Sequence, residues 1–188
     1  MDQESVLARA YNCYEKGQYE EAFAQYKNLA EQGNVDCQIF VAWMYQKGLG
    51  IEENQDEALK WYKQAAELGS EEGQFYLAKW HLKNRDNKAA FECFKRSSMN
   101  DYSPALYRLG WIYENGKGIG VDKNKALLYY ERSADLGHVF ALRNLGRMLK
   151  SGKYGYFKRL VGFLFIFKAF IIGIKVGFND PESVRLRD

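Results

Sequence analysis

Hydrophobic side chains along this chain recur at the spacing of amphipathic α-helices. In residues 58–66, apolar positions return every three or four residues, and residues 126–134 show the same pattern. This spacing places the apolar side chains on one face of a helix, and that face needs a second helix to cover it. The chain also contains only two prolines, so long segments can stay helical. The pattern predicts an all-α protein.

The helical pattern is an internal repeat. An alanine marks one position of each repeat, and a second column follows 23 residues later: Ala22, Ala58, Ala90 and Ala126, then Tyr45, His81, Tyr113 and Leu149. This interval is constant, whereas the interval from the second column to the next alanine is 9 or 13 residues. A constant interval indicates a rigid packed unit, and a variable one indicates a surface loop. We therefore expect an α-solenoid of about four antiparallel helix pairs in residues 1–152.

The repeated positions resemble Sel1-like repeats (SLR), which are relatives of tetratricopeptide repeats. The resemblance is carried by residues 109–113 (LGWIY), 116–119 (GKGI) and 134–137 (ADLG). A second close match covers residues 41–69, while two shorter repeats depart from the pattern. The resemblance implies a solenoid fold and a role as an assembly or signalling scaffold. Many members are bacterial, and some serve envelope or exopolysaccharide systems.

Two variable columns of the predicted first helices lie four residues apart and therefore share one helical face. One column comprises Ile39, Phe75, Tyr107 and Arg143, and the other comprises Trp43, Lys79, Trp111 and Arg147. The face is aromatic at first and becomes basic toward its C-terminal end. We expect it to form a groove that binds a peptide or protein segment, with Trp43, Tyr107 and Trp111 as anchors. Packing between adjacent repeats is the alternative role of these aromatic side chains.

The sequence contains no set of residues that predicts catalysis. The glycines of residues 116–120 resemble a phosphate-binding loop, but no strand precedes them and the repeat places them between two helices. His81 and His138 have no companions at metal-binding spacing. No nucleophile and base can be paired from the sequence. We therefore expect a non-enzymatic protein without a cofactor, a metal or a small-molecule substrate.

Composition changes this picture when it is counted by segment. The whole chain has a net charge of +3, which is too small to favour nucleic acid as a partner. Residues 153–188 contain seven Lys and Arg against three Asp and Glu, and they hold six of the twelve phenylalanines. The basic excess therefore lies entirely in the C-terminal segment. We predict two parts, a repeat domain at 1–152 and a basic, hydrophobic segment at 153–188.

The N-terminal residues and the cysteines favour a cytoplasmic location. Residues 1–5 are acidic and polar, unlike the basic start and apolar core of a secretory signal. The three cysteines are an odd number without metal-binding spacing: Cys13, Cys37 and Cys93. We expect them to be reduced thiols that are buried as small apolar side chains.

Residues 156–178 contain sixteen apolar residues out of twenty-three. By repeat register they include the second helix of a last pair, which would cap the solenoid or self-associate; the alternating Phe163, Phe165 and Phe167 also permit a strand. Lys168 interrupts the run, which is then shorter than the about 20 apolar residues that a membrane span requires. We favour a shallow segment on an anionic membrane surface. Its expected contacts with lipid or with a partner are Phe163, Phe165, Phe167, Phe170, Lys168 and Lys175.

These features predict a non-catalytic scaffold or adaptor. It would bind a protein partner in the repeat groove, peripherally on the cytoplasmic face of a membrane. The alternative is an accessory subunit of a membrane-associated enzyme complex, for example an envelope or polysaccharide system, anchored by the C-terminal segment.

Overall fold

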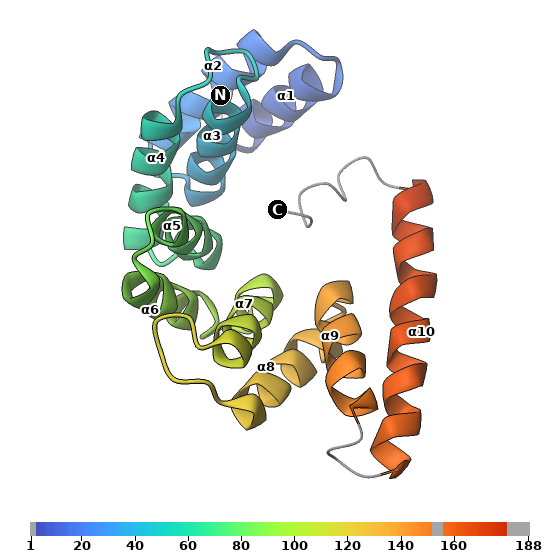
Figure 1. Ribbon diagram of the computed structural model, residues 1–188. Helices are drawn as coiled ribbons and strands as arrows, with labels where there is room; N and C mark the ends of the chain where they lie inside the picture. The colour runs from blue at the N-terminus through green and yellow to red at the C-terminus, as the bar shows by residue number, and fades with distance from the viewer. Residues whose placement is uncertain (1–2, 152–155, 180–188) are drawn as a thin grey trace. The chain divides into compact units, whose positions relative to one another are not determined.

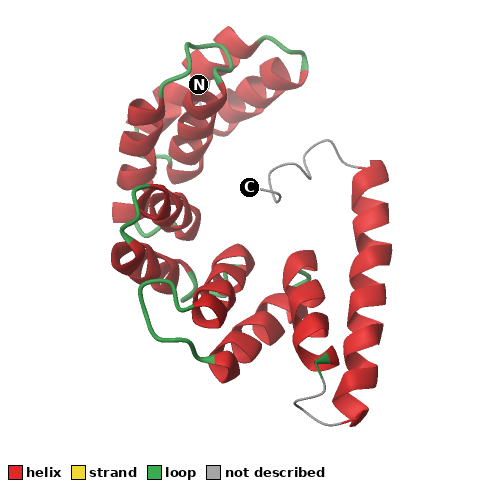
Figure 2. Cartoon of the chain, viewed as in Figure 1, coloured by secondary structure: helices red, strands yellow, loops and turns green. Residues whose placement is uncertain are grey.

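The computed structural model describes residues 3–151 and 156–179, with side chains in the second range described for 159–173. Within these ranges the chain forms ten α-helices and no strand (Figures 1 and 2), as the hydrophobic pattern predicts. It divides into two compact units, Met1–Arg85 and Asp86–Asp188. The predicted boundary at residue 152 rests on composition and stays a prediction.

The first unit contains five helices: α1 (Gln3–Glu15), α2 (Tyr19–Glu31), α3 (Val35–Lys47), α4 (Gln55–Glu67) and α5 (Glu71–Lys83). The second unit contains the other five: α6 (Asn87–Ser97), α7 (Ser103–Asn115), α8 (Lys123–Asp135), α9 (Val139–Lys150) and α10 (Tyr156–Asn179). Within each unit, helices that follow one another pack together, as in α3 with α4 and α7 with α8. The predicted helix pairs are therefore confirmed.

Helix starts follow the repeat register. Asn34, Ser70 and His138 occupy equivalent positions, and the side chain of each accepts a hydrogen bond from a backbone N–H three residues later. These bonds satisfy amide groups that have no partner inside the first turn of α3, α5 and α9. The same role at the start of α4, α6 and α8 falls to Asn54, Asp86 and Asp122.

Small residues allow close packing in the second unit. A Cβ added at Gly110 of α7 would lie 2.7 Å from the ring of Tyr130, which is completely buried. A Cβ added at Gly146 of α9 would lie 2.7 Å from the carbonyl oxygen of Gly162 in α10, and the reverse distance is also 2.7 Å. The backbones of α9 and α10 therefore meet without an intervening side chain.

Residues 156–179 of the hydrophobic C-terminal segment form the second helix of a pair. Helix α10 packs along α9 (Figure 1), and Val161 and Phe165 reach the core cluster that α8 and α9 form. The strand interpretation of residues 163–167 is wrong, because the side chains that meet α9 recur at helical rather than alternating spacing. All three cysteines are buried and free, as expected. Burial and the nearby Asp36 carboxylate raise the pKa of Cys37 to about 11.

Candidate partner-binding surfaces

In the first unit, the predicted groove residues differ in how far they reach the surface. Ile39 and Phe75 are buried, with 9% and 8% of their area exposed, and therefore serve mainly in packing. Trp43 is half-buried, with its ring centroid 6.0 Å from that of Tyr14 and 5.4 Å from that of Phe40. Lys79 is half-buried as well and opens onto a pocket.

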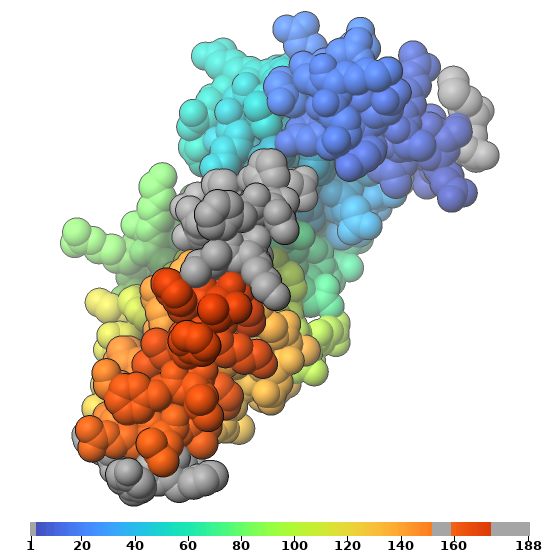
Figure 3. Space-filling model, turned by 90° about the vertical axis from the view of Figure 1, so that its right-hand side faces the viewer, coloured from blue at the N-terminus to red at the C-terminus, as the bar shows by residue number. Residues whose placement is uncertain are grey.

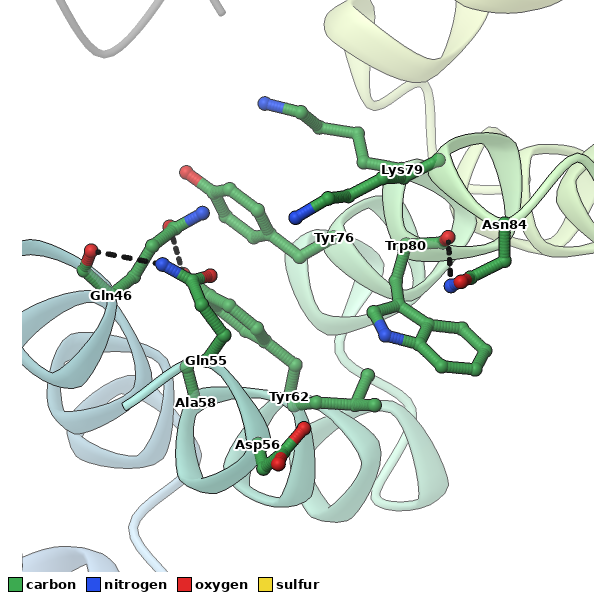
Figure 4. Close-up of a pocket in the computed structure, with 11 residues that line it drawn as sticks. Gln46, Gln55, Asp56, Ala58, Tyr62, Tyr76, Lys79, Trp80 and Asn84 are labelled. Carbon is green, nitrogen blue, oxygen red and sulfur yellow. Dashed lines mark hydrogen bonds between the residues drawn. The ribbon is translucent and has the colours of Figure 1, made fainter. Parts of the chain in front are cut away.

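This pocket lies between the end of α3 and the helices α4 and α5, and it has a volume of about 360 Å³ (Figure 4). Its lining comprises Gln46, Gln55, Asp56, Ala58, Leu59, Tyr62, Tyr76, Lys79, Trp80, Lys83 and Asn84. Except for Lys79, sequence reasoning did not find these residues, because three helices contribute them and no single helix pattern brings them together.

Aromatic stacking fixes one wall of the pocket. The rings of Tyr62 and Tyr76 stack at 4.3 Å between centroids, and the hydroxyl of Tyr62 donates to Oε1 of Gln46 at 3.3 Å. Tyr62 is 4% exposed and Ala58 2% exposed, so this wall is packed into the core of the unit. This wall of the pocket is therefore formed by packed side chains and is in place before a ligand binds.

Cationic side chains gather on the α5 side of the pocket. Lys79 and Lys83 lie one turn apart on this helix, and Nζ of Lys79 lies 5.5 Å from the ring centroid of Tyr76. Nζ of Lys63 lies 5.7 Å from the ring centroid of Trp80, itself 39% exposed. The one acidic residue of the lining is Asp56. The pocket thus combines an excess of positive charge with aromatic surface.

In the second unit, the predicted aromatic anchors also take part in packing. Tyr107 stacks on the imidazole of His138 at 4.7 Å between ring centroids. Trp111 is half-buried and packs against the core of α8 and α9. Arg143 is exposed, with its guanidinium carbon 5.3 Å from the ring centroid of Phe140. Packing is therefore at least part of what these aromatic side chains do.

Arg147, the last predicted groove residue, belongs to a polar network. Its guanidinium donates to both carboxylate oxygens of Glu114, at 2.6 and 2.9 Å. The hydroxyl of Tyr130 donates to Glu114 at 2.9 Å, and the amide of Asn144 donates to that hydroxyl at 3.3 Å. Burial and the adjacent carboxylate raise the pKa of Tyr130. This network joins α7, α8 and α9.

Sequence reasoning missed this network, although the register contains its signal. Tyr130 lies 16 residues after Glu114, and Tyr62 lies 16 residues after Gln46; both tyrosines donate to the earlier side chain. The network of the second unit therefore corresponds position by position to one wall of the pocket in the first unit.

His138 is the most strongly perturbed histidine. Burial, together with the nearby Arg108 guanidinium, lowers its pKa to about 4. The neutral ring accepts a hydrogen bond at Nδ1 from the backbone N–H of Ala141 at 3.2 Å. Among the described residues, no group of three or more His, Cys, Asp or Glu is placed to hold a metal ion.

Helix α10 presents an apolar face away from α9. Leu164, Phe167 and Phe170 are 66%, 64% and 63% exposed. Phe163 is exposed on the same face, whereas Phe165 is half-buried against the core. Lys168 is exposed, and the side chain of Lys175 lies outside the described residues. In the part of the chain that the structure describes, no helix combines the length and apolar character needed to cross a bilayer.

The stacked antiparallel pairs and their repeating caps define an α-solenoid protein. The Sel1 repeat matches residues 35–70, 71–102 and 103–138, and the chain belongs to this family. Sel1 repeat proteins generally mediate protein–protein interactions, and the relatives of this chain include regulators. The resemblance seen in the sequence is confirmed.

Known proteins support the same assignment. The chain is 25% identical over 157 residues to the exopolysaccharide production negative regulator of Rhizobium meliloti, covering 74% of this chain and 59% of that protein. It is also 25% identical over 146 residues to the ERAD-associated E3 ubiquitin-protein ligase component HRD3B of Arabidopsis thaliana. That match covers 69% of this chain but only 24% of the relative.

A solved structure shows the same fold. The Sel1 repeat protein of Oxalobacter formigenes superposes with a TM-score of 0.79 at 24% identity, over 89% of this chain and 73% of that one.

Proposed function

We propose that this protein is an adaptor that binds a protein partner on its repeats while α10 holds it against an anionic membrane surface. The family supports the first part, because its members mediate protein–protein interactions. The exposed apolar face of α10 is the single observation that carries the second part. Large apolar surfaces of this kind mark contacts with a partner or a membrane.

The arrangement of charge on α10 favours lipid as the occupant of this face. With about 3.6 residues per turn, Lys168 lies along one edge of the apolar face and Arg159 along the other. Nζ of Lys150, from α9, lies 4.8 Å from the ring centroid of Phe163. An apolar stripe between cationic edges matches a helix lying in the plane of an anionic membrane, where the rings enter the acyl boundary and the cations meet head groups.

The same charges disfavour a second copy as the occupant. The sequence of α10 contains four Lys and Arg and no Asp or Glu. Pairing two such helices along their apolar faces would bring like charges together, which raises the free energy of the pair. The outward side of α10, along which two copies would have to pair, faces the viewer in Figure 3 in orange to red.

Vesicle sedimentation of the full chain tests the membrane part. We expect binding to vesicles containing phosphatidylserine, weaker binding to phosphatidylcholine alone, and a loss of binding as salt screens the charges. The double variant Phe167→Ala and Phe170→Ala should bind at least about tenfold more weakly, since burying one such ring contributes about 1.5–3 kcal/mol. Leu128→Ala, at an exposed leucine of α8, is the matched control. Equal binding by all three proteins, or none by the parent, would refute the proposal.

The second candidate function is an accessory subunit of a membrane-associated enzyme complex. The relative in Rhizobium meliloti supports this candidate, because that protein is a negative regulator of exopolysaccharide production. Co-purification of one specific enzyme that depends on detergent would support this candidate. Vesicle binding by the isolated chain, without any enzyme, would instead support the adaptor.

A further inference from the structure

The pocket between α3, α4 and α5 has a counterpart in the second unit, and the two differ in charge. In the second unit, Glu114 of α7 receives the cation Arg147 and the hydroxyl of Tyr130. The equivalent positions in the first unit are Gln46, Lys79 and Tyr62. Gln46 is a neutral amide and accepts from Tyr62, as Glu114 accepts from Tyr130. The first unit thus keeps the cation and the tyrosine but replaces the carboxylate.

Trp80 also distinguishes the first unit. Its register equivalents Met44, Ile112 and Met148 are buried, with 0%, 0% and 7% of their area exposed. Trp80 is 39% exposed and lines the pocket beside the lysines. Figure 4 shows its indole between α4 and α5, across from Tyr62 and Tyr76. An exposed tryptophan in a preformed pocket provides apolar contact area and an N–H donor for a ligand.

Taken together, the pocket presents donors and aromatic surface with a net positive charge. Lys79 and Lys83 contribute two cations, the amide of Gln46 contributes N–H groups, and Asp56 contributes the one carboxylate. Nε2 of Gln55 donates to Glu53 at 2.8 Å, which holds that amide at the pocket edge. A ligand that complements both the positive charge and the aromatic surface of this pocket carries a carboxylate next to an apolar group.

We propose that this pocket binds an acidic segment of the partner protein, with a Glu or Asp carboxylate at Lys79 and Lys83 and an adjacent apolar side chain against Trp80. The side-chain amide of Gln46 can form hydrogen bonds with the backbone of a peptide. The carboxylate of Asp56 would repel a ligand that carries a run of phosphates. This inference rests on the proposed function and names the chemistry of the partner.

The test is a peptide array probed with the purified full chain. Each acidic peptide places Glu or Asp next to Leu or Phe, and its matched peptide carries Gln or Asn in place of the acids. We expect bound peptides to be strongly enriched in the acidic set, with affinities for the best of them measured by isothermal titration calorimetry. Equal binding of the two sets, no binding to either set, or tighter binding of single-stranded RNA, would overturn the proposal.

Three variants locate the site. Gln46→Glu places in the first unit the carboxylate found in the second, so it should weaken acidic peptides at least about tenfold while leaving the fold intact. Lys79→Gln should weaken them by a similar factor. Gln64→Glu makes the same charge change on the exposed surface of α4, outside the pocket, and should leave affinity unchanged. If Gln46→Glu and Gln64→Glu weaken peptide binding equally, the effect comes from the net charge of the protein and not from the pocket. That result would refute the site.

Failure here is separable from failure of the proposed function. Vesicle sedimentation reports on α10 in the second unit, whereas the array reports on a pocket in the first. Vesicle binding without acidic peptide binding would overturn only the pocket, and the reverse result would overturn only the membrane contact.

Discussion

Lowering the pH should destabilise the start of α9 through one side chain, His138. Its neutral imidazole caps the helix by accepting at Nδ1, packs on Tyr107 and lies close to the cation Arg108. Protonation removes the acceptor and places a second positive charge beside Arg108. Burial is the main reason that the pKa of His138 falls to about 4, and the charge of Arg108 adds to it.

The change in folding stability with pH follows from the difference in the pKa of His138 between the unfolded and the folded chain. The unfolded chain has the ordinary pKa of 6.5, so it binds more protons than the folded chain between that value and about 4. The stability contribution of the neutral ring is complete above pH 6.5 and is lost progressively as the pH falls toward 4. At about 1.4 kcal/mol per unit of pKa, the loss amounts to about 3 kcal/mol.

Hydrogen exchange of α9 amides at a series of pH values, corrected for the intrinsic exchange rate, measures this loss locally. The control variant is His138→Asn, because Asn34 caps α3 from the equivalent position without titrating in this range. The parent protein should lose protection in α9 below pH 6.5, while the variant keeps it. A parallel decline in both proteins would refute the assignment to His138.

Three further predictions concern packing and the predicted groove. Gly146→Ala should cost about 1–3 kcal/mol of unfolding free energy in urea titrations, because its Cβ meets the backbone of α10, whereas Gly173→Ala has open space and should cost nothing. Glu114→Gln should lower the free energy of unfolding by about 1 kcal/mol. In a double-mutant cycle, Glu114→Gln should cost much less when Arg147→Gln is already present. Additive single effects would contradict the pairing. Trp43→Ala and Trp111→Ala should weaken partner binding in titrations of the purified partner; unchanged affinity with unchanged stability would limit both residues to packing.

The sequence was sufficient for features that repeat along one helix. The constant 23-residue interval identified the rigid helix pairs, and the repeated positions identified the Sel1-like repeats. Cys37 shares its repeat position with Gly73, Ala105 and Ala141, and this column of small residues predicted its burial. Each of these features depends on local spacing, which the hydrophobic pattern encodes directly.

Features that join separate helices were out of reach. The pocket depends on how Gln46, Tyr76 and Lys83 come together from α3 and α5, and the spacing within each helix leaves that open. The direction in which each ring of α10 points was also missed: Phe165 turns toward the core while Phe167 turns outward, because the side of the helix that meets α9 is set by the Gly146–Gly162 contact.

Photo-crosslinking in cells tests both proposed contacts, the one in the pocket and the one on α10, in a single experiment. A photoreactive residue would replace Trp80 in the pocket, Phe167 on α10, or Leu128 on α8 as the control. We expect a crosslink from position 80 to an acidic segment of one protein, a crosslink from position 167 to lipid, and neither from position 128. Crosslinks from positions 80 and 167 to the same protein, with no lipid at position 167, would contradict this expectation.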